Sequence, residues 1–168
     1  TSTAEHFLKL RPGLRLMAET GGKNAMIVSR MSDRDLAVKD IVQSAFGHSG
    51  QKCSAASLLI CEAEVYDDPE FRRQLVDAAQ SLIVGSAWAP ATRVGPLISA
   101  PREPLLSGLT VLDEGEEWLL KPTQHGDASN LWTPGIKCGV QPGSRSHLSE
   151  FFGPVLSMMR ADSIEDAV

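Results

Sequence analysis

Short apolar runs alternate along the chain with segments in which apolar side chains recur at helical spacing. Such runs, when they are only a few residues long and bounded by turn-forming residues, are typical of buried strands. They predict strands at residues 14–17, 25–28, 58–61, 118–120, 136–140 and 155–159. The periodic segments between them predict helices.

Two of these helices have clear start signals. Ser32 and Asp33 can cap a helix whose apolar positions are Leu36, Ile41, Val42 and Phe46. The run Asp67-Asp68-Pro69-Glu70 indicates a second start, followed by Phe71, Leu75, Ala78, Ala79 and Leu82. Shorter helices are predicted at residues 3–10, at 105–109 and after 162–163, with loops at 85–98 and 122–130. The alternation predicts an α/β fold of three layers, a mostly parallel open sheet with helices on both faces.

A glycine-containing segment follows the first long helix. Residues 46–57 read Phe-Gly-His-Ser-Gly-Gln-Lys-Cys-Ser-Ala-Ala-Ser. Gly47 and Gly50 free the backbone to turn, which leaves Cys53 among small side chains where a substrate can approach. Lys52, and a helix start predicted at residues 54–57, would favour the thiolate form of Cys53. Spacing alone leaves open the alternative of a buried, inert cysteine.

Composition excludes several classes of protein. With 168 residues, 42% apolar and 22% charged, the chain is expected to fold as one globular domain. A net charge of −5 without a dense basic run argues against a nucleic-acid partner. No apolar run reaches the length of a membrane span, and no secretory signal is recognisable.

The cysteines and histidines do not form a framework of their own. The three cysteines, Cys53, Cys61 and Cys138, do not indicate a framework of paired disulfides, so a reducing, cytoplasmic location is expected. The four histidines lack the paired spacing of metal ligands, so no metal is expected. They are His6, His48, His125 and His147.

Three blocks, in order, resemble the aldehyde dehydrogenase superfamily. They are Glu-Thr-Gly-Gly-Lys-Asn at 19–24, Gly-Gln-Lys-Cys-Ser-Ala at 50–55 and Glu-Phe-Phe-Gly-Pro-Val at 150–155; Gly-Pro-Leu-Ile at 95–98 is a weaker fourth. Glu19 and Cys53 are 34 residues apart. The resemblance covers nearly the whole chain and is to the cysteine-bearing catalytic domain.

Within the superfamily, two segments are most similar to the branch that acts on L-glutamate γ-semialdehyde. These are residues 50–55 and the run Leu-Trp-Thr-Pro-Gly-Ile-Lys at 131–137. That branch includes the 1-pyrroline-5-carboxylate dehydrogenases and the dehydrogenase module of bifunctional proline-utilisation enzymes. The resemblance therefore implies oxidation of glutamate γ-semialdehyde to glutamate in proline catabolism.

The resemblance also implies which residues perform the chemistry. Cys53 would attack the aldehyde to give a thiohemiacetal, which collapses to a thioester, and its backbone N–H would form half of an oxyanion hole. Glu19 would be the base that activates water for thioester hydrolysis. Ser54 would contact the substrate. The alternatives are a solvent-exposed glutamate at Glu19 and a simple hydroxyl at a helix start for Ser54.

The implied cofactor is NAD, with NADP not excluded. Gly21 and Gly22 would let the backbone approach the nicotinamide, although a simple turn is the alternative. Glu150 would accept hydrogen bonds from the nicotinamide ribose, and Phe152 would pack against the same part of the cofactor. The alternative for this pair is a surface glutamate and a core phenylalanine.

The resemblance implies that residues 1–168 are one catalytic-domain fragment of a longer protein. The N-terminal dinucleotide-binding domain and a C-terminal substrate-anchoring segment would lie outside it, so the fragment alone is expected to be inactive. The full-length protein is expected to be a homo-oligomer whose small-molecule substrate is an aldehyde.

Three other functions are compatible with parts of the sequence. The first is an aldehyde dehydrogenase with a different substrate. The second is a cysteine hydrolase in which His48 or His147 is the base, which would need no nicotinamide and would leave the Glu150 block unexplained. The third is a non-catalytic interaction domain.

Overall fold

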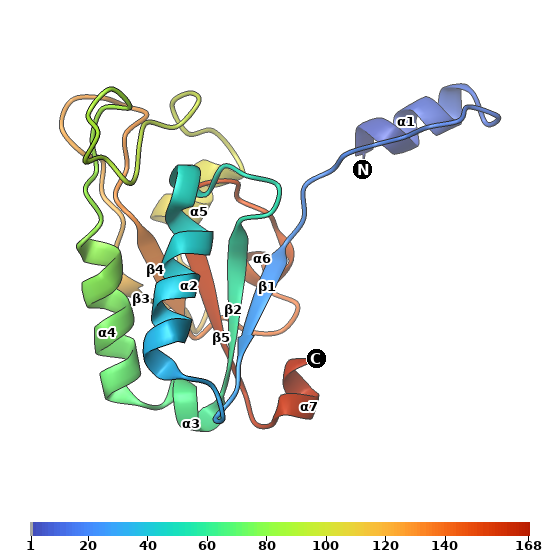
Figure 1. The fold of residues 1–168 in the computed structure, drawn as a ribbon. Helices are drawn as coiled ribbons and strands as arrows, with labels where there is room; N and C mark the ends of the chain where they lie inside the picture. The colour runs from blue at the N-terminus through green and yellow to red at the C-terminus, as the bar shows by residue number, and fades with distance from the viewer. Residues whose placement is uncertain (1) are drawn as a thin grey trace.

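A five-stranded sheet forms the centre of the structure, a computed structural model that describes residues 2–168 (Figure 1). The strand order is β1 (Asn24–Val28), β2 (Ala56–Glu62), β5 (Val155–Ala161), β4 (Gly135–Cys138) and β3 (Glu117–Leu120). Only the β3–β4 pair is antiparallel. The predicted α/β class and mostly parallel sheet are confirmed.

Two long helices cover one face of this sheet. They are α2 (Arg34–Phe46) and α4 (Pro69–Gln80), both in front of the strands in Figure 1. Each begins at the predicted cap, because the carboxylate of Asp33 accepts from Leu36 N and that of Asp68 from Glu70 N. Between helices and sheet lies the main core, which includes Ile41, Phe46, Leu75, Leu156 and Met158.

Shorter helices cover the opposite face. Leu105 and Leu109 of α5 (Leu105–Thr110) pack with Phe151 and Val155, and α6 (Arg145–Leu148) lies on the same side. Successive residues of a strand point to opposite faces, so Val155 faces α5 while Leu156 faces α2 and α4. Two further short helices are α3 (Ala63–Tyr66) and α7 (Ile164–Ala167). The three-layer arrangement is therefore as predicted.

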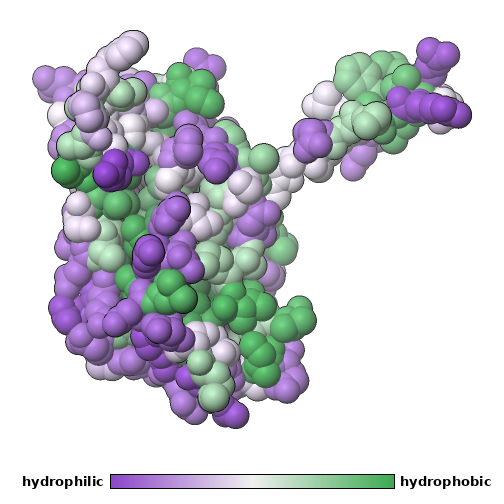
Figure 2. Space-filling view, viewed as in Figure 1, coloured by the Kyte–Doolittle hydropathy of each residue, from purple (hydrophilic) through white to green (hydrophobic). Residues whose placement is uncertain are grey.

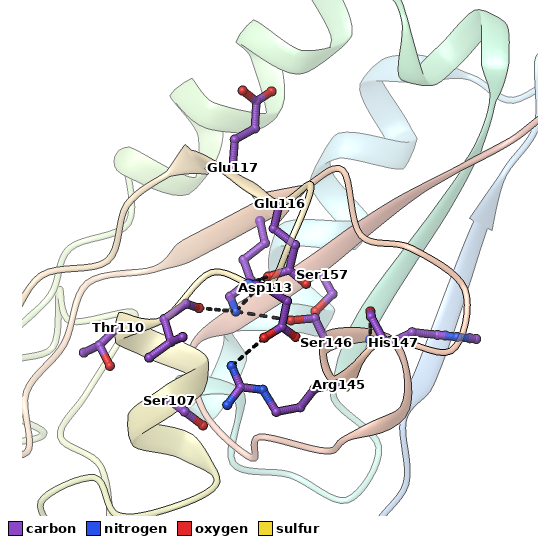
Figure 3. Close-up of polar contacts among 12 residues, drawn as sticks. Ser107, Thr110, Asp113, Glu116, Glu117, Arg145, Ser146, His147 and Ser157 are labelled. Carbon is purple, nitrogen blue, oxygen red and sulfur yellow. Dashed lines mark hydrogen bonds and ion pairs between the residues drawn. The ribbon is translucent and has the colours of Figure 1, made fainter.

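A buried ion pair lies beneath the sheet on the α5 and α6 side. The Lys137 ammonium donates to Val111 O at 2.7 Å, to Ser146 Oγ at 3.2 Å and to Glu116 Oε2 at 3.3 Å, and both charged side chains are fully buried. Figure 3 shows Glu116 pointing into this cluster and Glu117 pointing the other way, toward α4. Asp113 and Arg145 form a second ion pair beside it, at 2.9 Å.

An arm formed by the N-terminal residues stands away from the sheet (Figures 1 and 2). It consists of α1 (Ser2–Leu10), none of whose residues is buried, and the segment that leads to β1. The strand predicted at residues 14–17 is wrong: these residues have no regular secondary structure, and Met17 is 99% exposed. A strand is stable only beside a partner, and none of the described strands pairs with this run.

The helix start predicted at residues 54–57 is also wrong. Cys53 and Ser54 form a turn, and β2 begins at Ala56, which pairs with Asn24 of β1. Ala56 N also donates to Ser44 Oγ of α2, at 3.2 Å. Cys53 therefore does not precede a helix N-terminus. Within residues 2–168, no helix is long and apolar enough to cross a membrane.

Candidate active site

Cys53 lies exposed in the loop that joins α2 to β2. The loop starts from Phe46, whose side chain is completely buried and fixes the end of α2 in the core. It then passes through the tight turn η1 (Gly47–Gly50) and closes with a hydrogen bond from Ala55 N to Lys52 O at 3.0 Å. The thiol is thus presented on a short loop with both ends anchored, as expected for a nucleophile that a substrate must reach.

Asn24, the first residue of β1, holds this loop against the strand. Its Nδ2 donates to Cys53 O at 2.6 Å and to Ala55 O at 3.1 Å. A side-chain amide has two N–H donors, and here both serve the cysteine loop. Asn24 belongs to the motif at residues 19–24, and its position after Gly21, Gly22 and Lys23 was the available signal for this role, which was not predicted.

The turn η1 has an unusual backbone. His48, Ser49 and Gly50 have φ angles of 53°, 57° and 68°, in the left-handed region that disfavours side chains. Ser49 Oγ donates to Gly95 O at 2.7 Å, which ties the turn to the segment 95–98. Left-handed non-glycine residues persist only where surrounding contacts hold them, and they concentrate at functional sites.

Glu150 and Gly21 are in direct contact. A side chain at Gly21 would overlap the Glu150 carboxylate, which therefore rests on bare backbone. Glu150 is partly exposed and forms no hydrogen bond with residues 2–168. Its oxygens remain free to accept hydrogen bonds from a vicinal diol such as a ribose. The residues present thus fit the nicotinamide half of a dinucleotide at this point.

Phe151 and Phe152 have opposite environments although they are adjacent. Phe151 is 2% exposed and belongs to the core beside α5, whereas Phe152 is 36% exposed and has a φ of 57°. The Phe152 carbonyl accepts a hydrogen bond from Gln51 Nε2 at 3.2 Å. The exposed ring is the one that the sequence predicted to face a cofactor.

Lys23 directly follows Gly21 and Gly22, and its side chain reaches Ser157 on β5. Its ammonium is 3.4 Å from Ser157 Oγ and 4.9 Å from the centre of the Phe151 ring. Burial, reinforced by the positive charge of Lys137, lowers the pKa of Lys23 to about 8, while Glu116 and Glu150 act in the opposite direction. Lys23 was missed as a site residue.

Glu19 lies outside the regular elements of the structure. It is exposed in the segment between α1 and β1 and forms no hydrogen bond with Cys53. The prediction that it follows a strand is wrong because no strand forms there. A Cβ added at Gly22 would lie 3.7 Å from Asn24 Oδ1, an ordinary van der Waals distance.

A polar pocket of about 490 Å³ lies beside the cysteine loop. Lys52 and Ser54, the two neighbours of Cys53 in the chain, line it together with His48 and Asp40. Ser54 thus faces a space that a small molecule can enter, although its predicted helix does not exist. Lys52 and Asp40 give this pocket one positive and one negative side chain, which suits a compound that carries both a carboxylate and an ammonium group.

The histidines do not form a second catalytic arrangement. His147 lies on α6, and its Nδ1 accepts from Gly143 N at 2.9 Å; His48 lines the polar pocket. Neither forms a hydrogen bond with Cys53, which a hydrolase base would be expected to approach. In the part of the chain that the structure describes, no group of three His, Cys, Asp or Glu side chains is placed to hold a metal ion.

The fold thus combines an α/β sheet with an exposed cysteine loop that is hydrogen-bonded, through Gln51, to the segment 150–153. This combination can be compared with known protein families. The model of the aldehyde dehydrogenase family matches residues 1–168, and the chain belongs to this family. That match confirms the family resemblance recognised in the sequence.

The individual relatives are more specific. The chain is 34% identical over 169 residues to 1-pyrroline-5-carboxylate dehydrogenase of Geobacillus kaustophilus, covering 98% of this chain and 32% of that protein. Proline utilization A of Corynebacterium freiburgense is 49% identical with a TM-score of 0.93, covering 99% of this chain and 17% of the other. The 1-pyrroline-5-carboxylate dehydrogenase from Thermus, solved with bound NAD, is 35% identical with a TM-score of 0.76, covering 89% and 28%. The chain spans about a third of the length of the curated relatives it matches.

Replacing Asn24 by alanine is expected to loosen the cysteine loop. Two carbonyls lose their donor, at a cost of about 1–2 kcal/mol, so amides of residues 53–57 should exchange roughly 5–30-fold faster. Hydrogen exchange read by mass spectrometry on the whole protein measures this. Gln141→Ala, which removes a side-chain amide bonded to Gly139 O, is the control and should leave these amides unchanged. Equal exchange in both variants would contradict the role of Asn24.

Proposed function

We propose that the protein containing this chain oxidises L-glutamate γ-semialdehyde to L-glutamate with NAD. The observation that carries the proposal is the arrangement of two loops: Cys53 is exposed on one, and Glu150 with Phe152 on the other, joined by the hydrogen bond from Gln51. A nucleophile and a site that fits a nicotinamide ribose thus lie on adjoining segments. The similarity to 1-pyrroline-5-carboxylate dehydrogenases supports the choice of substrate.

Cys53 acts as the nucleophile in this proposal. Its thiolate adds to the aldehyde carbon, and the resulting oxyanion is stabilised by the Cys53 backbone N–H. Bound NAD supplies the hydride acceptor when that adduct is oxidised to the thioester. Sulfur suits both stages because it is a strong nucleophile and then a good leaving group.

Glu19 is proposed as the base that activates water for hydrolysis of the thioester. Its exposed, irregular segment must then bring the carboxylate toward the Cys53 loop in the whole protein. Gly21 leaves room for Glu150, and these two residues, together with Gly22 and Phe152, form the proposed surface for the nicotinamide end of the cofactor.

The pocket next to Cys53 suits the substrate's other end. Glutamate semialdehyde carries its ammonium and carboxylate on the α-carbon, which is about three bonds from the aldehyde carbon, and Ser54, Lys52 and Asp40 line the polar pocket. Charged groups recognise such a zwitterion in a way that an apolar pocket cannot. Ser54 is proposed to contact the substrate directly.

The rest of the protein is proposed to complete the site. Residues 1–168 form the catalytic domain, and a separate domain binds the remainder of the dinucleotide, because the relatives are about three times longer than the matched region. We expect these domains to assemble as a homo-oligomer and the chain alone to be inactive.

The test is an assay of the whole protein with NAD and a panel of aldehydes. NADH formation is followed by absorbance. We expect kcat/KM to be highest with glutamate γ-semialdehyde and at least about tenfold lower with an uncharged aldehyde of similar length. Activity on other aldehydes alone would remove the proposed substrate and keep the chemistry. Absence of NAD reduction with every aldehyde would refute the proposed function.

A further inference from the structure

Gln51 lies two residues before Cys53 and joins three loops through one side chain. Its Oε1 accepts from Ile98 N at 3.0 Å, and its Nε2 donates to Phe152 O at 3.2 Å. Only a side chain with both a donor and an acceptor at its end can make this pair of bonds. The residue is thus bonded to the segment 95–98 on one side and to the cofactor-facing segment on the other.

The backbones of the same loops also touch. A side chain at Gly50, next to Gln51, would overlap the carbonyl of Gly153, next to Phe152. No side chain therefore separates the cysteine loop from the cofactor-facing segment at this point. Since closely packed groups transmit displacement, movement of Phe152 is passed to residues 50 and 51.

Phe152 has a backbone conformation that such movement can change. Its φ of 57° is disfavoured for a residue with a side chain, while its ring is exposed. A conformation of this kind is kept by its contacts, and the hydrogen bond from Gln51 to the Phe152 carbonyl is one of them. Losing that bond would release both Phe152 and the start of the cysteine loop.

We propose that Gln51 is a positioning residue that couples the cofactor-facing Phe152 to the nucleophile loop, so that a dinucleotide bound at Phe152 fixes the position of Cys53. This inference rests on the proposed function, because it takes Phe152 as a cofactor contact and Cys53 as the nucleophile. Coupling between two sites is reciprocal, so changes at Cys53 are also felt in NAD affinity.

The test measures alkylation of Cys53 by iodoacetamide in the whole protein, with and without saturating NAD. In the protein without substitutions, the rate of Cys53 alkylation with NAD is expected to differ from the rate without NAD by a ratio of about fivefold or more. In Gln51→Glu, which has no donor for Phe152 O, this ratio is expected to fall to about one, and the KM for NAD to rise about fivefold or more. Gln80→Glu makes the same change at the exposed end of α4 and is expected to keep the full ratio.

Each outcome decides the inference. An unchanged ratio in Gln51→Glu overturns the coupling, as does NAD binding that leaves alkylation of the unmodified protein unaffected. A purely structural role would lower the melting temperature of Gln51→Glu and leave the ratio intact. If Gln51→Glu does not fold, Gln51→Met is interpreted in the same way. Failure of calorimetry to detect NAD binding to the unmodified protein refutes the proposed function as well.

Discussion

Replacing Cys53 by serine is expected to lower the rate of NADH formation by about 10⁴-fold or more. The serine hydroxyl is a far weaker nucleophile than a thiolate, and among residues 2–168 no side-chain base forms a hydrogen bond with this position that could activate it. The exposed loop should fold as before, because Asn24 bonds to the backbone carbonyl of residue 53 and not to its side chain. The assay is steady-state NAD reduction by the whole protein with glutamate γ-semialdehyde.

The other two cysteines provide the control. Burial raises the pKa of Cys61 to about 12 and that of Cys138 to about 11, so both remain protonated thiols near neutral pH. Iodoacetamide at pH 7.5 should therefore alkylate Cys53, among these three residues, and abolish activity in proportion to that modification. Mass spectrometry locates the label. Loss of activity that follows labelling of Cys61 or Cys138 would contradict the assignment of Cys53 as the nucleophile.

Replacing Glu116 by alanine is expected to lower the free energy of unfolding by about 3–5 kcal/mol. The change leaves the Lys137 ammonium buried with only Val111 O and Ser146 Oγ as acceptors. The double variant Glu116→Leu with Lys137→Met removes both charges and should regain most of the loss. Urea unfolding of the whole protein, followed by tryptophan fluorescence, measures it, since Trp118 lies 5.3 Å from the Lys137 ammonium.

The adjacent Glu117 is the matched control for Glu116. Its side chain is 72% exposed and pairs with Arg72 at 3.4 Å on the opposite face of the sheet. Because solvent screens such a pair, Glu117→Ala should cost about 1 kcal/mol or less. Similar losses in both variants would show that the burial of Glu116 is not what matters.

The pH dependence of this loss has a definite sign. Burial lowers the pKa of Lys137 below 10.5, and Glu116 partly opposes that effect. Between the lowered pKa and 10.5 the unfolded chain holds the proton more often than the folded chain, so stability rises with pH. Without Glu116 the folded pKa falls further and the window widens. Glu116→Ala should therefore be less destabilising at pH 9.5 than at pH 7.

The sequence predicted the elements that carry strong local signals. The caps at Asp33 and Asp68 and the apolar strands 25–28, 58–61 and 155–159 appear where expected. The run at 14–17 is also mostly apolar, with Arg15 as its one charged residue, yet it forms no strand. The difference lies in distant partners, since β2 lies between β1 and β5, whereas none of the described strands pairs with residues 14–17.

The chemistry of the candidate site depended on motifs more than on pattern. Spacing alone favoured an inert core position for Cys53, whereas the structure shows it exposed. Of two neighbouring phenylalanines, the family resemblance selected Phe152, which is exposed, while Phe151 is in the core. Hydropathy could not have separated two identical residues.

The contacts that join the site could not be predicted from the sequence. Asn24 bonds to Cys53 across 29 positions, and Gln51 to Phe152 across 101 positions. Such contacts depend on how the strands and loops assemble in three dimensions, and a single sequence does not reveal that arrangement. For the same reason nothing in the sequence indicated that the charge of Lys137 is buried against Glu116.

The order of strands has a consequence for how the chain matures on the ribosome. β5 is synthesised after the other four strands, yet it lies at the centre of the sheet, between β2 and β4. Until residues 155–161 leave the exit tunnel, β1 with β2 and β3 with β4 can form only separate halves, each with an open strand edge. Such edges invite pairing with other nascent chains. A stop codon shortly before residue 155 should therefore yield aggregated polypeptide and not a smaller folded domain.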